Sequence, residues 1–396
     1  TAMLTVPSVH PALMALLTGA PPTREWLAAL SQQDWETIVE DAVAQRLAPI
    51  LFHWLDHSPH QLLLPGHSHQ RLHRHILQQA AWNLLLTEEL HRILVACETR
   101  HIRCLPIRGP LFAAQLYGES AVRQMDDLDL LVQHDDLPAL KEIFDQLGYA
   151  AHEQRPGFLE AFSYSLEFYH PRHGVIVEPH WTLAYPPFVT AAPMEPVWAR
   201  TERRRILGIE TSTLCHADLL LHLCLHLLHK GTQAPLLWYY EIDRLIRQNK
   251  DSLNWNTVVD QAREMGLAGL IAEVLATIAY HFHSPMPRAI LNRLRTPSRN
   301  GALRSPAPVR EWMLTHSSLN GREEFALLCS LPGLRSKLAY AAALLFPSPR
   351  YMAQRYALSG PLDLPRAYLG RISRLFWDSC RWTTACVLAA LTQRQN

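Results

Sequence analysis

The sequence lacks the cysteine patterns that would hold a small secreted domain or a structural zinc ion. Seven cysteines occur in 396 residues, an odd number, and no two of them form a Cys-x-x-Cys pair. A disulfide framework and a zinc ribbon are therefore disfavoured, because both rely on paired cysteines at regular spacing. A reducing compartment, the cytoplasm, fits this composition.

An excess of charge of one sign is also missing. Lys and Arg number 37 against 36 Asp and Glu, which disfavours a broad surface for long nucleic acid. The first residues carry no basic segment before their apolar patch, so no signal peptide is expected. The most apolar late stretch, residues 338–349, ends at prolines and is too short for a transmembrane segment. With 48% hydrophobic residues, the chain is expected to be soluble and to fold around a large core.

Most of the chain shows apolar residues at helical spacing. This pattern predicts two helices within residues 24–55, with Ser31 capping the second, and one long helix over residues 71–100. The same spacing returns at residue 215 and continues to the end, with a break at residues 296–308. We therefore expect mostly helical segments at both ends of the chain.

The central part follows a shorter period. Its pattern predicts, in order, a strand ending at Gly109, a helix at 110–118, a strand within 125–133, a helix at 135–149 and a hairpin at 161–181 that turns at 171–174. The predicted organisation is a helical region at 1–100, an α/β core at 101–190, a helical region closing the cleft at 191–300 and a C-terminal helical region at 301–396.

Two carboxylates interrupt the predicted strand at residues 127–132. Because side chains alternate along a strand, Asp127 and Asp129 share one face and lie about 7 Å apart along it. Burying unpaired carboxylates is costly, so the pair needs a cation, a basic partner or open water. Mg²⁺ is the expected ion, since it prefers oxygen ligands and is commonly held by carboxylates together with substrate phosphates. Removing either charge is expected to relieve repulsion.

A third carboxylate lies in a similar setting. Glu178 follows an apolar run in GVIVEPHW, and its strand could pair with the strand of the two Asp residues. Three carboxylates suit a two-metal phosphoryl or nucleotidyl transfer. Arg108 and Gly109 precede the helix predicted at 110–118. Arg108 could supply positive charge, and Gly109 could let the backbone approach phosphates closely.

Several stretches of the chain together resemble one known family: LPIRGPLFAAQLYG (105–118), VRQMDDLDLLV (122–132), DQLGY (145–149) and VEPHWTL (177–183). They are similar to the uncharacterised nucleotidyltransferases of bacterial biosynthetic clusters, within the DNA polymerase β-like superfamily. The resemblance is tight over residues 102–183 and loose over most of the chain. It implies an α+β fold, with a small polymerase β-like nucleotidyltransferase unit embedded between mostly helical N- and C-terminal regions.

The resemblance also implies roles for individual residues. Asp127, Asp129 and Glu178 would be the catalytic carboxylates that bind metal, with two Mg²⁺ ions expected. Arg108, Gly109 and Arg123 would bind the nucleotide. The family commonly has Lys where this chain has Arg108, and the superfamily favours Gly-Ser or Gly-Gly where it has Gly109 followed by proline.

Other polar residues leave alternatives open. His180 could position substrate or the third carboxylate, or be a core histidine. His226 and His229, with His222, fall at helical spacing and are expected to line the cleft rather than to bind zinc. Lys230 beside them could bind nucleotide phosphates.

Asp243 is interpreted either as a cleft residue or as half of a buried or surface pair. Asp126 is expected to pair with Arg123. Two late stretches, residues 338–360 and 368–393, combine Arg with aromatic residues. Ordinary packing is favoured for them over binding to a membrane or a partner.

The expected function is therefore a Mg²⁺-dependent transfer of a nucleoside monophosphate from an NTP, with ATP as the expected donor. The acceptor would be a hydroxyl or phosphate on a small molecule, a sugar or a peptide. Three alternatives remain: a catalytically impaired nucleotide-binding or interaction protein of the same fold, a kinase-like phosphotransferase, and a toxin-like modifier of tRNA or protein.

Overall fold

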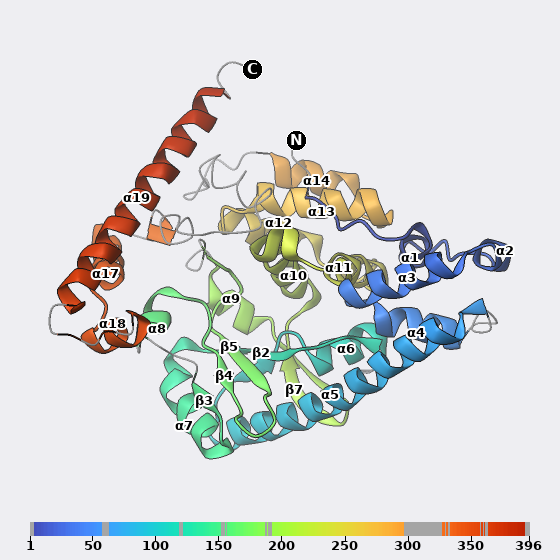
Figure 1. Ribbon diagram of the computed structural model, residues 1–396, viewed down its shortest axis with the longest axis horizontal. Coiled ribbons are helices and arrows are strands. Elements are labelled where there is room, and N and C mark those ends of the chain that lie inside the picture. Colours follow the sequence, from blue (N-terminus) through green and yellow to red (C-terminus); the bar gives the residue numbers. More distant parts are fainter. Residues whose placement is uncertain are drawn as a thin grey trace.

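The computed structural model describes most of the chain: residues 4–57, 63–118, 122–151, 155, 157–186, 188, 192–296, 327–328, 330–331, 333–356, 358, 360 and 363–392, without the side chains of 354, 378, 379 and 381–392. Helices at the two ends of the chain flank a small central sheet (Figure 1). The α+β fold class expected from the sequence is confirmed, with the sheet unit set between mostly helical regions.

The N-terminal region consists of α1 (Pro11–Leu17), α2 (Arg24–Ala28), α3 (Gln32–Ala44), α4 (Ala48–Asp56) and the long α5 (Gly66–Thr99). Ser31 caps α3 as predicted: its Oγ accepts from the Asp34 N–H at 3.2 Å, and Asp34 Oδ2 accepts from the Ser31 N–H at 2.9 Å. This capping box makes a helix boundary inside residues 24–55, which hold three helices rather than the two expected.

The central sheet has five strands: β1 (Cys104–Pro106), β2 (Asp127–Val132), β3 (Ala150–Ala151), β4 (Phe168–Tyr169) and β5 (Ile176–His180). Their order is β1-β2-β5-β4-β3, and β2 and β5 run parallel while the other pairs are antiparallel. The predicted hairpin is therefore present as β4 and β5. The predicted helices are α6 (Pro110–Tyr117) and α7 (Leu137–Leu147), the latter after a 3₁₀ turn, η3 (His134–Asp136).

The two faces of β2 have opposite partners. Leu128, Leu130 and Val132 lie in a buried cluster with apolar residues of α5 and α7, including Leu90 and Phe144. The aspartates point to the other face, as the period-two alternation requires. Helices α10 and α11 lie on that side (Figure 1).

A second hairpin interrupts the helical pattern expected for residues 191–300. After α9 (Met194–Ala199), β6 (Glu202–Ile206) and β7 (Ile209–Thr213) pair antiparallel. Their turn consists of Leu207 (φ +52°) and Gly208 (φ +78°), two left-handed residues of the kind that close a tight hairpin. The alternating ILGIETST pattern around Gly208 was the available signal, and three consecutive arginines in β6 obscured it.

The chain continues with α10 (His216–Lys230), η4 (Gly231–Gln233), α11 (Leu236–Gln248), α12 (Trp255–Glu264), α13 (Ala268–Phe282) and α14 (Arg288–Arg295). α12 and α13 pack against α10, and α14 packs against α12 and α13. Twelve consecutive residues of α10, from Ala217 to Leu228, are buried. A helix buried on all sides forms the centre of a packed layer, so α10 holds its polar side chains directly against the sheet unit.

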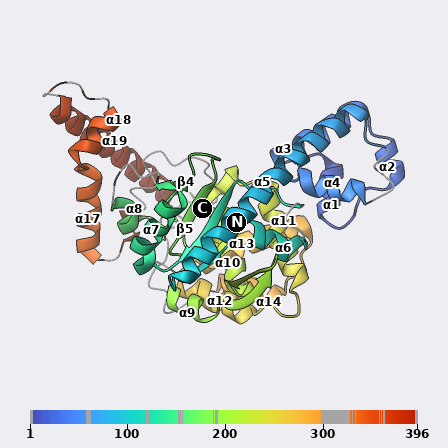
Figure 2. The same cartoon turned by 90° about the horizontal axis from the view of Figure 1, so that it is seen from below.

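The C-terminal part forms an arm on one side of the molecule, made of α17 (Gly333–Leu345), α18 (Pro349–Tyr356) and α19 (Asp363–Thr392). Figures 1 and 2 show the arm beside α7 and α8 (Phe158–Phe162), on the side opposite the N-terminal helices. Tyr340 joins it to α8 through ring contacts with Phe158 and Phe162. Nearly all of the predicted break at residues 296–308 lies outside the described residues. Among the described helices, none has both the length and the hydrophobicity of a membrane span.

Candidate functional site

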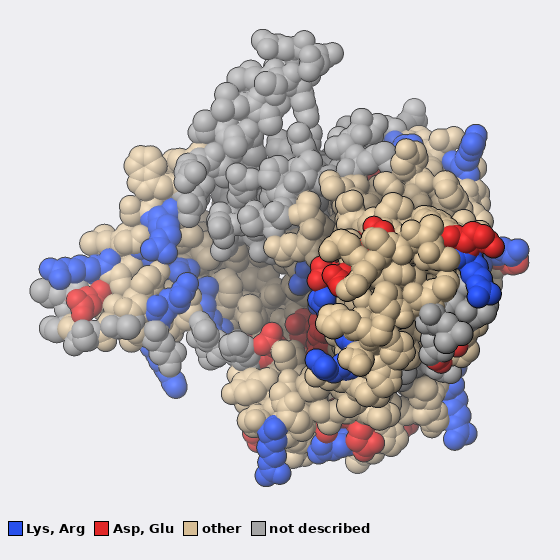
Figure 3. Space-filling view, turned by 45° about the vertical axis from the view of Figure 1, so that its right-hand side comes forward, with Lys and Arg blue, Asp and Glu red and all other residues tan. Residues whose placement is uncertain are grey.

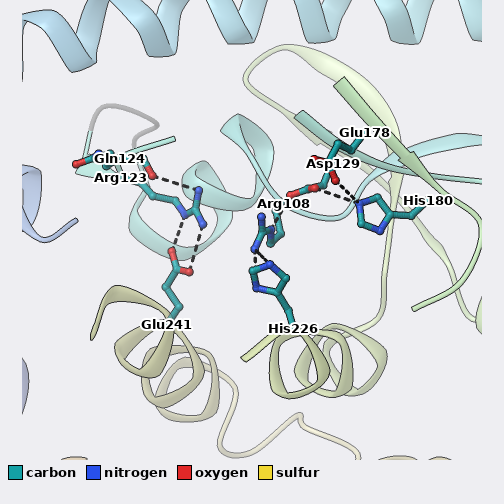
Figure 4. A network of polar contacts seen from close by, with 8 residues as sticks. All are labelled: Arg108, Arg123, Gln124, Asp129, Glu178, His180, His226 and Glu241. Atoms are coloured by element: carbon teal, nitrogen blue, oxygen red, sulfur yellow. Dashed lines mark hydrogen bonds and ion pairs between the residues drawn. The ribbon is translucent and has the colours of Figure 1, made fainter. Parts of the chain in front are cut away.

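Parallel pairing of β2 with β5 brings together two acids and a histidine from distant parts of the chain. Asp129 lies directly opposite Glu178 in the register, and His180 follows two residues later on the same face. His180 Nε2 is 3.1 Å from Asp129 Oδ1 and 3.7 Å from Glu178 Oε2 (Figure 4). One ligand atom from each of the three lies within 4.8 Å of the others. Two carboxylates and an imidazole at this spacing can hold a divalent cation.

Asp127 lies at the edge of this group. It shares the face of Asp129, two residues earlier in β2 and opposite Ile176. Burial and the Asp129 carboxylate raise the pKa of Asp127 to about 6. The structure therefore keeps the expected acids on one face, and it brings His180 rather than Asp127 into closest contact with Asp129 and Glu178.

Arg108 is inserted between the acid group and α10. Its Nε donates to Asp129 Oδ2 at 2.6 Å, and its Nη1 lies 2.7 and 2.8 Å from Nδ1 and Nε2 of His226 (Figure 4). Because a guanidinium can only donate, the facing nitrogen of His226 accepts and this ring is neutral. Burial and Arg108 hold the pKa of His226 well below its usual value, in agreement with a neutral ring. The guanidinium also lies 5.3 Å from the ring centre of Trp238.

The turn that carries Arg108 is fixed by the backbone of β2. The Ile107 N–H donates to the Asp129 carbonyl at 3.0 Å. Gly109 has φ +86°, a left-handed conformation that residues with a Cβ rarely adopt, and its carbonyl accepts from the Ala113 N–H in the first turn of α6. Gly109 therefore lets the chain turn from β1 into α6 directly beside Asp127 and Asp129.

The charges in this site are unequally compensated. Burial alone would raise the pKa of Asp129, but Arg108 and His180 hold it well below its usual range. Burial alone would lower the pKa of Arg108, but Asp129 and Asp127 raise it. Within the described part of the chain, no arginine forms an ion pair with Glu178. Burial and Asp129 raise its pKa to about 7, although His180 and Lys230 act in the opposite direction. A cation near Glu178 and Asp127 would supply the missing positive charge.

Histidines of α10 and nearby tyrosines form the wall opposite the sheet. The ring of Tyr185 stacks on those of His222 and His229, with ring centres 5.9 and 4.7 Å apart. Burial, with a smaller effect of Arg108 on the first and of Lys230 on the second, lowers the pKa of His222 and of His229 to about 3. The wall is therefore uncharged at neutral pH. Lys230, at the end of α10, is exposed.

Arg123 lies in a separate buried pair. Its guanidinium donates to Glu241 of α11, with Nε to Oε1 at 2.5 Å and Nη2 to Oε2 at 3.3 Å (Figure 4). Asn83 and Gln79 of α5 fix this segment by donating to the Arg123 and Met125 carbonyls at 2.8 and 2.9 Å. The structure thus places Arg123 beside α11, and it does not bring this side chain into contact with the acid group.

The ion pairs of Asp126 and Asp243 can be compared with those expected from the sequence. Asp126 forms an ion pair with Arg46 of the segment after α3, so the expected pair with Arg123 is wrong. Arg123 prefers Glu241 because both are buried and their geometry is bidentate. The buried Asp243 pairs with the exposed Arg247 at 2.8 Å, which is the pairing alternative considered for it.

A pocket of about 480 Å³ adjoins the site. Its lining includes Arg46, Lys230 and Trp238, and it is bounded by the N-terminal segment, the end of α3 and the loop before α11. Trp238 also contacts Arg108 and His226, with the His226 ring centre 4.1 Å away. The pocket therefore offers Lys230, Arg46 in its ion pair with Asp126, and an aromatic side chain next to the buried group. The sequence patterns gave no reason to select Arg46, Trp238, Tyr185 or Glu241.

Comparisons with known proteins place the chain in a family. The model of a family described as uncharacterised nucleotidyltransferase matches residues 31–283, more than half of the chain. A solution structure of the antibiotic-resistance factor ANT(2'')-Ia is similar at 14% identity, covering 49% of this chain and 95% of that one with a TM-score of 0.32. That score is too low to support an argument about fold or function. No curated protein matches the chain.

Proposed function

The chain belongs to the family of uncharacterised nucleotidyltransferases, and from this premise we propose that it moves a nucleoside monophosphate from an NTP to an acceptor. ATP is the proposed donor, and the acceptor is a hydroxyl or phosphate of a small molecule, sugar or peptide. The attacking oxygen forms a bond to the α-phosphorus, and pyrophosphate leaves. The observation that carries the proposal is the buried group of Asp129, Glu178 and His180 beside the Arg108 turn.

The donor atoms of the site fit divalent cations. Asp129, Glu178 and His180 would hold one ion, and Asp127 with Asp129 would take part in holding a second, with Mg²⁺ as the proposed metal. When bound, such ions neutralise phosphate charge and lower the pKa of an attacking hydroxyl. The raised pKa values of Asp127 and Glu178, about 6 and 7, support the fit, because nearby positive charge would restore both carboxylates to their ionised form.

The remaining residues of the site would bind and orient the substrates. Arg108 is held by Asp129 in the structure, and a cation at Asp129 would compete with it and free its guanidinium for phosphate oxygens. Lys230 lines the adjoining pocket and suits an anionic group, whereas Arg46 beside it is paired with Asp126. Trp238 offers a flat apolar surface on which a base or ring could stack.

The direct test is to incubate the protein with NTPs labelled on the α- or the γ-phosphate, with Mg²⁺ or Mn²⁺, and with three acceptor pools: a small-molecule extract, tRNA and total protein. Transfer of the α-label with release of pyrophosphate supports the proposal, and the labelled pool identifies the acceptor class. Transfer of the γ-label would instead support the kinase-like alternative. Binding of NTP without turnover in any pool would support an impaired binding protein.

Glu178→Gln is expected to leave NTP affinity nearly unchanged and to lower kcat by about 10²-fold or more. The reason is that NTP brings one cation with its phosphates, whereas Glu178 belongs to the group that would hold the other. The measurements are NTP Kd, kcat and the urea midpoint of unfolding. A less stable variant with normal kcat per folded molecule would show that Glu178 only supports the hairpin of β4 and β5.

His180→Gln is expected to weaken Mn²⁺ binding about tenfold and Mg²⁺ binding less, because an imidazole ligand favours Mn²⁺ over the harder ion. Electron paramagnetic resonance of free Mn²⁺ measures this without any assay of activity. The matched control is His170→Gln, a buried histidine in the turn between β4 and β5 that lies outside the acid group. Equal losses in both variants, or no loss in His180→Gln, would remove His180 from the ligand set.

A further inference from the structure

The positive charge of this nearly neutral chain is concentrated in its C-terminal part. Residues 327–396 contain nine Lys or Arg and two Asp, whereas residues 1–326 contain 28 Lys or Arg and 34 Asp or Glu. The C-terminal part is therefore at +7 and the remainder at −6. Figure 3 shows Lys and Arg side chains gathered on the arm at the left of the view, with few acidic side chains among them. A division of charge this strong between two parts of one chain indicates an anionic partner for the basic part.

The exposed face of α17 is apolar. Leu334, Leu338 and Phe346 are exposed at 72%, 60% and 63%. Together with Ala342, they are spaced four residues apart and therefore lie along one side of α17; Phe346 is the first residue after the helix. The side chain of Tyr340 points elsewhere: it is buried against α8. Internal packing of the arm therefore uses a different face and leaves this row in solvent.

α19 repeats the arrangement and adds arginines. Leu369, Phe376 and Trp377 are exposed at 67%, 63% and 64%. Arg366 and Arg374 are exposed with them, three residues before Leu369 and two before Phe376. Six of the thirteen large apolar side chains that are exposed in the described part of the chain lie in this arm.

One face of α19 packs against the other two helices of the arm. Arg371 donates to the Leu344 carbonyl at 2.8 Å and lies over Tyr351, and the Tyr368 hydroxyl donates to the Pro347 carbonyl at 2.5 Å. These contacts fix α19 against α17 and α18. The exposed apolar and basic residues are thus not needed to hold the arm together. The packing role that the sequence favours accounts for only one face of these helices.

We infer that the arm docks on the surface of an anionic lipid bilayer. Apolar and aromatic side chains of α17 and α19 would enter the boundary between headgroups and acyl chains, while the neighbouring Arg and Lys side chains contact lipid phosphates. A nucleic acid would account for the basic side chains but not for the apolar ones, because contacts with phosphates do not require exposed Leu and Phe side chains. Since none of the described helices could span a membrane, the arm lies on the surface. This inference is independent of the nucleotidyl transfer proposed above.

The test is co-sedimentation of the full chain with vesicles of phosphatidylcholine alone or of phosphatidylcholine with one-third phosphatidylglycerol. The partition coefficient is expected to be at least tenfold higher for the anionic vesicles, and to fall as salt is raised. Equal partitioning into both vesicle types, or no binding to either, would overturn the inference.

Paired variants identify the surface. Leu369→Ser with Phe376→Ser is expected to lower the partition coefficient at least tenfold. Leu77→Ser with Leu84→Ser is the matched control, because these exposed residues of α5 have the same seven-residue spacing and lie outside the arm. Equal effects of the two double variants would contradict docking through the arm. Circular dichroism on each variant shows whether the fold is intact.

Charge reversal separates lipid from nucleic acid. Arg366→Glu with Arg374→Glu is expected to abolish binding to the anionic vesicles, whereas Arg203→Glu with Arg205→Glu, an equal charge change on exposed β6, reduces it only slightly. The native protein and the four double variants, two with serine and two with glutamate substitutions, are also tested for tRNA retention on filters. A nucleic-acid surface would give a different result: the native protein would bind tRNA but not vesicles. Binding of tRNA would then be lost with Arg366→Glu and Arg374→Glu and kept with Leu369→Ser and Phe376→Ser.

Discussion

Asp129→Asn is expected to lower the rate of transfer by about 10²-fold or more and to destabilise the protein by about 3–5 kcal/mol. Asp129 is the shared partner of Arg108, at 2.6 Å, and of His180, at 3.1 Å, and all three side chains are buried. Without the carboxylate charge, the Arg108 guanidinium stays in the interior with no anion in contact. The loss is therefore one of structure as well as of a proposed metal ligand.

Asp127→Asn is expected to reduce activity to a similar degree and to keep or raise stability. The pKa of Asp127 is raised from 3.8 to about 6, so the folded protein binds this proton more tightly than the unfolded chain. Stability is therefore lost as the pH rises from about 4 to about 6, and the full cost remains at neutral pH. Removing the charge recovers on the order of 1–3 kcal/mol at pH 7.

Urea unfolding at pH 4 and pH 7, with a chelator present, distinguishes the two variants. Asp127→Asn should equal the native protein at pH 4 and exceed it at pH 7, whereas Asp129→Asn should be less stable at both. The sequence suggests that removing either charge relieves repulsion, and the structure corrects this for Asp129 because Arg108 lies against it. Equal stability changes in both variants would contradict the pairing of Arg108 with Asp129.

Arg123→Met should destabilise the fold by about 3–5 kcal/mol, because it leaves Glu241 charged and buried without a partner. Combining it with Glu241→Leu should recover most of that loss, since a buried ion pair can be replaced by apolar residues of similar size. Arg71→Met is the matched control: its pair with Glu40 is exposed and should cost less than about 1 kcal/mol.

The double variant also tests the nucleotide-binding role assigned to Arg123 by family resemblance. If Arg123 only fixes the segment before β2 to α11, the restored protein should bind NTP with the native Kd. If Arg123 contacts the nucleotide, the affinity should stay low although stability has returned. Isothermal titration with Mg²⁺–NTP, beside urea unfolding of the same samples, distinguishes these outcomes.

Local patterns predicted the parts of the fold that depend on neighbours in sequence. Alternating aspartate and leucine predicted strand β2. Gly109 and Pro110 marked the start of α6, and Ser31 marked the start of α3. In each case the signal acts within a few residues, through side-chain alternation, a positive φ or a capping bond. The hairpin of β6 and β7 was not predicted, because β6 carries three consecutive arginines and because its turn uses leucine and glycine instead of the more common asparagine and glycine.

The sequence by itself determined that Asp127 and Asp129 share a face of one strand, and that Glu178 and His180 share a face of another, because the period of a strand is a local property. Only the tertiary structure decided that these strands run parallel with Asp129 opposite Glu178. It likewise decided that Arg108 lies between Asp129 and His226, a residue more than a hundred positions away. Register and long-range pairing depend on the packing of the whole chain, which brings α10 against the sheet and removes these charges from water.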